Sequence, residues 1–212
     1  MKLAWSPETA SMAYIDTVKL CELHHDTGVA ELVSAMAAGW NAKFIVETWS
    51  HGGAIAMSIG LAVASSHTNG GHVCIVPDER SRFEYVQALE VAGMSPEVIV
   101  GEPEDLVSGL NGIDFMVADR QRNDFSRVFQ LANLSKKGAV MVCKNANSRR
   151  DLSFSWRSII DGGSRQLIHS MFLPVGKGLD IAHVATGGGN SGKRRWIRQI
   201  DRQSGEEYVI RK

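Results

Sequence analysis

The sequence predicts an α/β protein built on a mostly parallel β-sheet, and three observations support this. Apolar segments typical of strands alternate with segments typical of helices, which is the pattern of α/β domains. The strand segments, such as HVCIV, IDFMVA and GAVMVC, are almost continuously apolar, as parallel strands covered on both faces are. After about residue 150 the alternation gives way to paired strands, which predicts an antiparallel edge. A chain of 212 residues fits one domain with one core.

Two helices are expected before the first strand. Ser6 is a suitable N-cap, and Pro7 suits the first helical position. Apolar residues follow at helical spacing up to Cys21. A second helix is expected over 27–38, ending at Gly39, because glycine commonly terminates helices.

Five strand–helix units are expected next. Strands are expected near 43–47, 72–76, 97–100, 113–118 and 138–143, and helices near 53–67, 79–92, 103–109 and 123–134. RQLIHSMFLPVGKGLDIAHV predicts two strands joined at PVGKG, and RRWIRQIDRQSGEEYVIRK predicts a β-hairpin. The single domain then comprises N-terminal helices (1–42), a ligand-binding core (43–150), an antiparallel sheet edge (151–185) and a basic link with the hairpin (186–212).

Composition narrows the class of protein. Apolar residues make up 44% of the chain, enough for a packed core. The N-terminus lacks the apolar stretch of a signal peptide, and no apolar run reaches the roughly 18 to 20 residues of a membrane span. Cys21, Cys74 and Cys143 are isolated, which is typical of a reducing compartment. We therefore expect a cytoplasmic protein without a membrane segment.

The two halves of the chain differ in charge although the formal net charge is zero. Residues 1–106 carry a net charge of −9, and residues 107–212 carry +9. Two explanations are open. In the first, the two halves pair across the fold or their charges lie on different solvent-exposed faces. In the second, the basic half binds an anionic partner. In the second case the contacts would be made near the hairpin by Lys193, Arg194, Arg195 and Arg198. The hairpin could equally form a homodimer contact through its apolar residues Trp196, Ile197 and Ile200.

A polar or glycine residue follows each of the five predicted parallel strands. In chain order these residues are Glu47, Asp78 with Glu79, Gly101 with Glu102, Asp119, and Asn145. One acid after a strand is usually a helix cap or a solvated turn. Five such positions together predict a pocket, because ligands bind at the carboxyl edge of open α/β sheets. The two carboxylate oxygens of Glu47 could accept hydrogen bonds from two ribose hydroxyls.

The succession FIVET…GG, VCIVPDE, VGEPEDL, IDFMVADRQRNDF, KKGAVMVCKN and FLPVGKGLDIA resembles class I S-adenosylmethionine-dependent methyltransferases, nearest the caffeoyl-CoA and catechol O-methyltransferase branch. The resemblance covers about residues 5–185, and the whole chain resembles a plant family of uncharacterised proteins in that superfamily. It implies a three-layer Rossmann-like fold whose seven-stranded sheet has a reversed last strand. It also implies S-adenosylmethionine as the cofactor. Glu47, Gly53, Asp78 and Glu102 would face its methionine, ribose and adenine parts.

The first loop departs from the superfamily's pattern, which is E-x-G-x-x-x-G. Here Glu47 and Gly53 match, but Trp49 replaces the first glycine. Glycine permits a positive φ, whereas another residue in that region loses roughly 1–2 kcal/mol. Gly52 could relax the loop by one position. We expect Trp49 beside the methionine end, with Ser50 and Gly52 completing the loop.

The metal site of the resembled branch is altered as well. The resemblance places Asp119 as one ligand and an Asp-Asn pair after the fifth strand as the others. This chain has Lys144-Asn145 there, and Gln121 replaces a further acid. Mg²⁺ needs oxygen ligands, which an ammonium cannot supply. We therefore expect no metal, and a catalytic centre of Asp119, Lys144 and Asn145 in which Lys144 pairs with Asp119. The alternative is that Lys144 extends to solvent.

Other motifs are weaker. GGGNSGKR resembles a phosphate loop but lacks the hydroxyl residue after the lysine and precedes a predicted strand. His24 and His25 are adjacent and point to different sides of a helix, and His51 could be a base or a loop hydrogen-bonding group. Two functions stay open: a methyltransferase acting on a small acceptor, or a non-catalytic methyltransferase-like protein that binds a nucleoside-type ligand or a partner.

Overall fold

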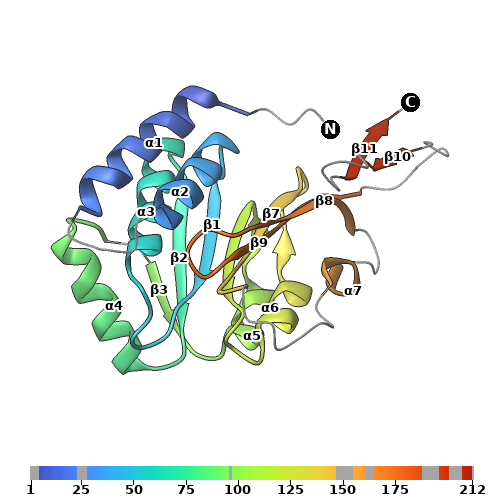
Figure 1. The fold of residues 1–212 in the computed structure, drawn as a ribbon. Helices are drawn as coiled ribbons and strands as arrows, with labels where there is room; N and C mark the ends of the chain where they lie inside the picture. The colour runs from blue at the N-terminus through green and yellow to red at the C-terminus, as the bar shows by residue number, and fades with distance from the viewer. Residues whose placement is uncertain are drawn as a thin grey trace.

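A seven-stranded sheet forms the centre of the molecule (Figure 1). The computed structural model describes residues 5–22, 28–95, 97–146, 155–160 and 165–187, and the two strands 196–200 and 207–211. The strand order is β3-β2-β1-β5-β7-β9-β8. The bounds are β1 Phe44–Thr48, β2 Gly71–Val76, β3 Glu97–Val100, β5 Phe115–Asp119, β7 Ala139–Lys144, β8 Arg165–Leu173 and β9 Leu179–Thr186. The first five are mutually parallel, and β9 runs antiparallel to both β7 and β8. The predicted sheet with a reversed last strand is confirmed.

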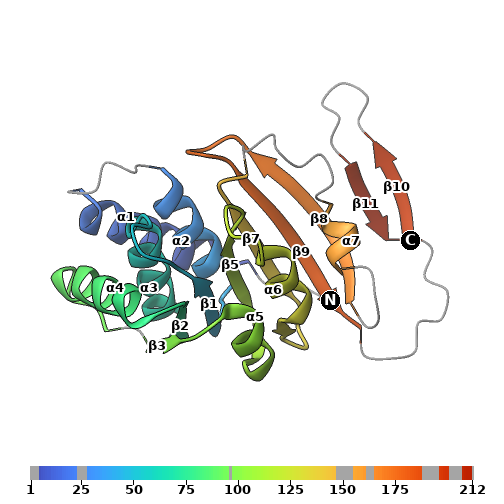
Figure 2. The same cartoon turned by 90° about the horizontal axis from the view of Figure 1, so that it is seen from below.

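Helices cover both faces of the sheet, which gives the predicted three layers (Figures 1 and 2). One face packs against α1 Pro7–Leu20, α2 Val29–Gly39, α3 Ala56–Thr68 and α4 Glu79–Val91. The other packs against α5 Pro103–Leu106, η1 Val107–Gly109, α6 Phe125–Leu131 and α7 Trp156–Ile160. A short parallel pair, β4 Asn111–Ile113 and β6 Asn133–Leu134, lies outside the main sheet.

Local signals place most helix ends correctly. The side chain of Ser6 accepts a hydrogen bond from the Thr9 amide at the start of α1, and α2 ends at Gly39. The prediction of one helix over 123–134 is wrong at its end. The chain leaves α6 at Leu131, and Asn133 and Leu134 pair with β4 instead. The sequence analysis did not anticipate α7.

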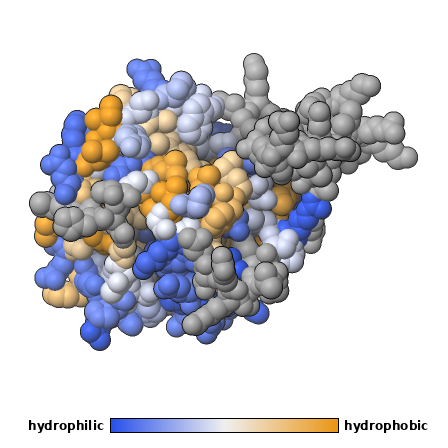
Figure 3. Space-filling model, in the orientation of Figure 1, coloured by the Kyte–Doolittle hydropathy of each residue, from blue (hydrophilic) through white to orange (hydrophobic). Residues whose placement is uncertain are grey.

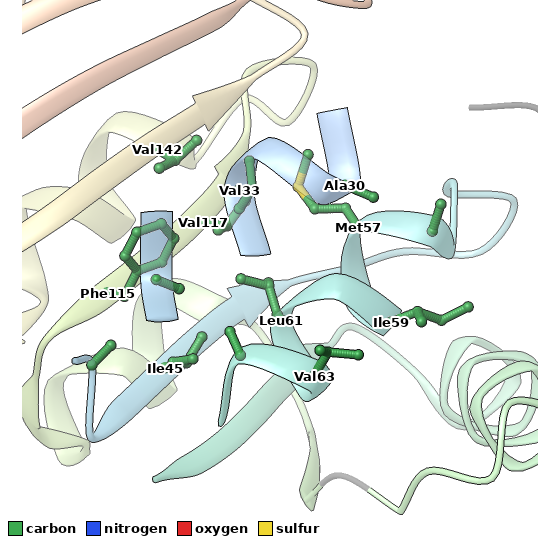
Figure 4. Close-up of a cluster of buried hydrophobic side chains, with 14 of the residues drawn as sticks. Ala30, Val33, Ile45, Met57, Ile59, Leu61, Val63, Phe115, Val117 and Val142 are labelled. Carbon is green, nitrogen blue, oxygen red and sulfur yellow. The ribbon is translucent and has the colours of Figure 1, made fainter. Parts of the chain in front are cut away.

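The larger hydrophobic cluster lies between α3 and the sheet (Figure 4). Leu61 of α3 lies near Ile45 of β1 and Phe115 of β5, and all three are fully buried (Figure 4). Gly60 allows α3 to approach α2, because a Cβ there would lie 2.6 Å from the Ala30 carbonyl oxygen. This close packing fixes the N-terminal end of α3, which lines the cavity described below.

The outer face of α1 is apolar and exposed. Met12, Ile15 and Val18 are each more than a third exposed, and Figure 3 shows apolar residues on the side of the molecule where Figure 1 places α1. Among the described residues, no helix is long and apolar enough to cross a membrane. The three cysteines are free and buried, and burial raises the pKa of the Cys143 thiol to about 12.

The predicted C-terminal hairpin is present as β10 Trp196–Ile200 paired antiparallel with β11 Glu207–Arg211, and β11 lies beside β8. Its side chains lie outside the described residues, as do Lys193, Arg194, Arg195, His24 and His25. The anionic-partner and homodimer contacts expected for this segment therefore stay predictions.

Candidate binding cavity at the carboxyl edge of the sheet

A cavity of about 160 Å³ opens at the carboxyl ends of β1, β5 and β7. Its walls are the turn at 52–54 with the first turn of α3, the start of α2, and the β8–β9 turn at 175–178. The polar side chains that line it are Asp119, Gln121, Lys144, Asn145 and Lys177. The predicted pocket is therefore present, but centred on β1, β5 and β7 rather than spread along all five strand ends.

Lys144 pairs with Asp119, as the sequence predicted. The two residues are neighbours in the register of β5 and β7, so their side chains leave the sheet side by side. The Lys144 ammonium lies 3.8 Å from Asp119 Oδ2, with 12% and 21% of the two side chains exposed. The alternative, in which Lys144 extends to solvent, is wrong.

Both oxygens of Asp119 are engaged by the protein. The Asn145 amide donates to Oδ2 at 2.7 Å, and the Gln121 backbone N–H donates to Oδ1 at 2.9 Å. Asn145 adopts a left-handed conformation with φ of 60°, which asparagine tolerates better than most residues. This turn aims its amide back at Asp119. The carboxylate is thus held by two hydrogen-bond donors and by the ion pair with Lys144.

The backbone around the cavity favours negative charge. The first turn of α3 lines the cavity, and its N-cap, Ile55, has no side chain that could accept from the free N–H groups. The start of α2 also lines the cavity, but there Glu31 accepts from the Gly28 amide. Helix N-termini carry partial positive charge, and that of α3 faces the same space as Lys144 and Lys177.

Trp49 lies in the core and does not line the cavity. Its side chain is 2% exposed, and its ring packs edge-on against Tyr85 of α4 with ring centroids 5.4 Å apart. The Trp49 amide donates to the Ile75 carbonyl, so residue 49 extends the strand pairing and has no positive φ. The expected strain at Trp49 is absent, because Gly52, with φ of 75°, makes the left-handed turn instead.

Side chains of α4 hold the loop that follows β1. The Ser81 hydroxyl accepts from the His51 amide at 3.2 Å, and Glu84 accepts from the Gly52 amide at 3.2 Å. The His51 ring also pairs with Glu84. The Gly53 amide donates to the Ser50 carbonyl within the loop. These three backbone N–H groups therefore bond within the protein and are not available to a ligand. The His51 side chain holds the loop in place through its pairing with Glu84.

Glu47 is buried beneath the site rather than exposed in it. Its carboxylate is 1% exposed and accepts from three side chains: Tyr85 at 2.5 Å, Ser58 at 3.0 Å and His72 at 3.0 Å. Burial opposes ionisation, yet the hydrogen bond and charge of His72 hold the pKa of Glu47 below its ordinary value. Burial also raises the pKa of Tyr85, which keeps the hydroxyl a donor. The ribose contact predicted for Glu47 does not fit this environment.

The remaining predicted residues lie at the strand ends outside the cavity. Asp78 is exposed and caps α4 by accepting from the Ser81 amide at 2.7 Å, which holds the pKa of Asp78 below its ordinary value. Glu79 is exposed and pairs with Arg82, and Glu102 lies 3.4 Å from Arg122. Gly101 follows β3 with φ of 147°. Asp78 and Glu79 thus have roles within α4, as a helix cap and in an ion pair, and both side chains remain exposed to solvent.

The sequence analysis missed two walls of the cavity. The β8–β9 turn contributes Val175, Gly176, Lys177 and Gly178, and the start of α2 contributes Val29 and Ala30. The glycines of PVGKG mark a turn, but only the strand order shows that this turn reaches the end of β7. The α4 residues that hold the loop, Ser81, Glu84 and Tyr85, carried no signal in the sequence.

Comparisons with known proteins agree with this fold. The model of a family described as a protein of unknown function, DUF1442, matches residues 1–212, and the chain belongs to this family. No curated protein matched significantly.

Among solved structures, a methyltransferase from Geobacter sulfurreducens is 20% identical, with 81% of this chain and 88% of that chain covered and a TM-score of 0.60. The O-methyltransferase TomG from Streptomyces achromogenes, solved in complex with SAM, is 19% identical over 88% and 92%, with a TM-score of 0.56. An O-methyltransferase from Bacillus cereus, solved in complex with SAH, is 16% identical over 86% and 92%, with a TM-score of 0.56. The predicted Rossmann-like methyltransferase fold is confirmed.

Proposed function

We propose that this member of the DUF1442 family transfers a methyl group from S-adenosylmethionine to a small acceptor without a metal ion. The observation that carries the proposal is the cavity at the carboxyl edge, in which the Lys144 ammonium stands beside Asp119. The similar folds of TomG and of the Bacillus cereus enzyme, solved with SAM and SAH, support the donor.

The residues at the cavity fit the methionine end of the donor. Gly52, where a Cβ would meet open space, leaves room for a ligand, and the uncapped first turn of α3 favours a carboxylate. Asp78, Glu79, Gly101 and Glu102 would hold the ribose and adenine at the accessible ends of β2 and β3. A cavity of about 160 Å³ is below the roughly 300 Å³ at which ligand pockets begin, so most of the donor would lie outside it, with its methyl group directed toward an acceptor beside Lys144.

Bound S-adenosylmethionine supplies a methyl group on a positively charged sulfur, which is already a good electrophile. The protein must therefore align an acceptor with that methyl group, and alignment alone contributes much of the rate in such reactions. Lys144 and Lys177 attract and orient a polar acceptor at the mouth formed by the β8–β9 turn. Asn145 and the Gln121 amide hold Asp119 still, which in turn fixes the Lys144 ammonium. Asp119, Lys144 and Asn145 are thus the proposed catalytic residues.

The positive charge of Lys144 supports the proposed metal independence. The Lys144 ammonium supplies the positive charge that compensates Asp119 and cannot itself be a metal ligand. Among the described residues, no group of three or more His, Cys, Asp and Glu side chains is arranged to hold a metal ion.

A second candidate is a methyltransferase-like protein that binds a ligand without transferring a methyl group. The observation favouring it is the loop after β1. Trp49 fills the space beneath the loop, and α4 occupies the His51 and Gly52 amides. A donor that needs those amides must first release them from Ser81 and Glu84.

Calorimetry with S-adenosylmethionine and S-adenosylhomocysteine, followed by a methyl-transfer assay with and without EDTA, separates the candidates. The methyltransferase proposal expects both nucleosides to bind and transfer to be unchanged by the chelator. Binding without transfer to any acceptor would favour the second candidate. Absence of binding would refute the donor, and loss of transfer in EDTA would refute metal independence. A cytoplasmic location and a C-terminal anionic partner or homodimer contact remain proposals from the sequence.

A further inference from the structure

The described side chains that line the cavity include one carboxylate, and it is already hydrogen-bonded within the protein. Among the described side chains that line it, Asp119 is the one carboxylate, and its two oxygens already accept from the Gln121 amide and from Asn145. The ammonium groups of Lys144 and Lys177 have no lone pair, and the amides of Gln121 and Asn145 are not bases. An acceptor that reacts without losing a proton would leave these contacts of Asp119 undisturbed.

The charge of the cavity selects an anion. Its charged side chains are two lysines and one aspartate, and the uncapped turn of α3 adds partial positive charge. Asp119 lies 3.8 Å from Lys144, which is beyond a short hydrogen bond, so the ammonium keeps donors for a ligand.

The volume limits the size of that anion. A cavity of about 150 Å³ accepts a benzene ring, and this cavity measures about 160 Å³. It therefore fits a short acid or one substituted ring.

We propose that this cavity binds a small carboxylate and that Lys144 is the residue that recognises it. The proposal rests on the described cavity and deepens the proposed methyl transfer, in which the carboxylate is the acceptor. A carboxylate oxygen then attacks the methyl carbon, the O–C bond forms and the C–S bond breaks. The bond's electron pair passes to sulfur, which leaves as a neutral thioether, and the product is a methyl ester. No proton moves, so the reaction does not require Asp119 to give up its contacts with Gln121 and Asn145.

Benzoate and benzamide test the recognition without any methyl donor. They have the same shape, but only benzoate is charged, so calorimetry at pH 7 should show benzoate binding more tightly by about 10-fold or more. Lys144→Met should reduce benzoate affinity by about 10- to 100-fold and leave benzamide nearly unchanged. Lys144→Arg, which keeps the charge, should retain part of the preference.

Lys19→Met is the matched control. Lys19 also pairs with an aspartate, at 3.0 Å from Asp16, but it lies on α1 and lines no part of the cavity. This variant should bind benzoate as the unmodified protein does. Circular dichroism melts check that each variant is folded.

The outcomes are distinct from those of the proposed function. Equal affinity for benzoate and benzamide in the unmodified protein would overturn the proposal without any variant, as would no detectable binding of either. If folded Lys144→Met binds benzoate as tightly as the unmodified protein, Lys144 is not the residue that recognises the carboxylate. If benzoate binds selectively but S-adenosylmethionine does not bind, the carboxylate site stands and the methyltransferase function falls. Methyl benzoate formed on addition of S-adenosylmethionine would support both.

Discussion

Replacing Lys144 by aspartate tests whether the lysine occupies the place of a cation. The Lys144 ammonium lies 3.8 Å from Asp119 Oδ2, and both side chains are mostly buried. At an effective dielectric of about 20, this attraction amounts to about 4 kcal/mol, and a second carboxylate would replace it by repulsion. Breaking buried pairs costs about 3–5 kcal/mol. We therefore expect Lys144→Asp to lower the melting temperature by about 6 to 20 °C in EDTA.

Divalent cations should offset part of this loss of stability. The new carboxylate, Asp119 and the Asn145 side chain offer the oxygen ligands that Mg²⁺ and Mn²⁺ prefer. A cation at 100 times its dissociation constant stabilises the folded protein by about 2.7 kcal/mol, or about 5 to 10 °C for a chain of this size. The assay is a thermal melt over a range of Mn²⁺ concentrations, with calorimetry to confirm the binding.

Two variants control this experiment. Lys144→Asn removes the ammonium without adding negative charge, so it should respond to Mn²⁺ less than Lys144→Asp. Arg82→Asp places a carboxylate beside the exposed Glu79 on α4, outside the cavity, and should not respond. Tight Mn²⁺ binding by the unmodified protein, or a Lys144→Asp protein that gains no stability from Mn²⁺, would refute the reasoning.

Three further predictions follow from the core, from a buried histidine and from the sequence. Trp49→Ala should lower the free energy of unfolding by about 3–5 kcal/mol because it empties the space against Tyr85, whereas Trp49→Phe should cost less; an unchanged denaturation midpoint for Trp49→Ala would contradict the packing. Burial and the charge of His169 lower the pKa of His183. As pH falls, the unfolded chain therefore takes up a proton at this histidine before the folded chain does, and the folded protein should lose stability below about pH 6.5. The fall in melting temperature between about pH 7.5 and about pH 5.5 should be smaller for His183→Phe than for the unmodified protein. If the basic residues of segment 193–198 bind an anionic partner, affinity for a polyphosphate should decline steeply with salt, and glutamate at those positions should flatten the slope; salt-independent binding would leave them a solvated surface.

The pairing of Lys144 with Asp119 could be predicted because it depends on little beyond strand order. Both residues end apolar strands, and adjacent parallel strands bring their carboxyl ends together. The strands themselves were recognisable from their continuous apolar runs. The end of α6 was not recognisable from the sequence. Leu134 pairs with β4 instead of continuing the helix, and helical spacing of apolar residues does not predict such a pairing.

The role of Glu47 shows why the site was harder to predict than the fold. Side chains alternate along a strand, so Glu47 shares the face of Ile45, which is fully buried under α3. That alternation was visible in the sequence and argued against exposure. What it could not show is that His72 of β2, Ser58 of α3 and Tyr85 of α4 would meet there to satisfy the carboxylate. A buried acid is tolerable only with such partners, and they come from three separate elements.

The tryptophan at position 49 explains why the cavity lies where it does. The buried Trp49 ring packs against Tyr85 of α4, and α4 lies close to the loop backbone. Ser81 and Glu84 then accept from the His51 and Gly52 amides, which closes the β1–β2 side of the carboxyl edge to backbone recognition of a ligand. The β1–β5–β7 side stays open, and there Lys144 supplies positive charge at a position where the resembled enzymes are expected to hold a metal ion. An ammonium attracts and orients an anion through its N–H donors, but it lacks the empty coordination sites through which a metal ion binds oxygen ligands. The chemistry that Lys144 supports is therefore recognition of an anionic group at this end of the cavity.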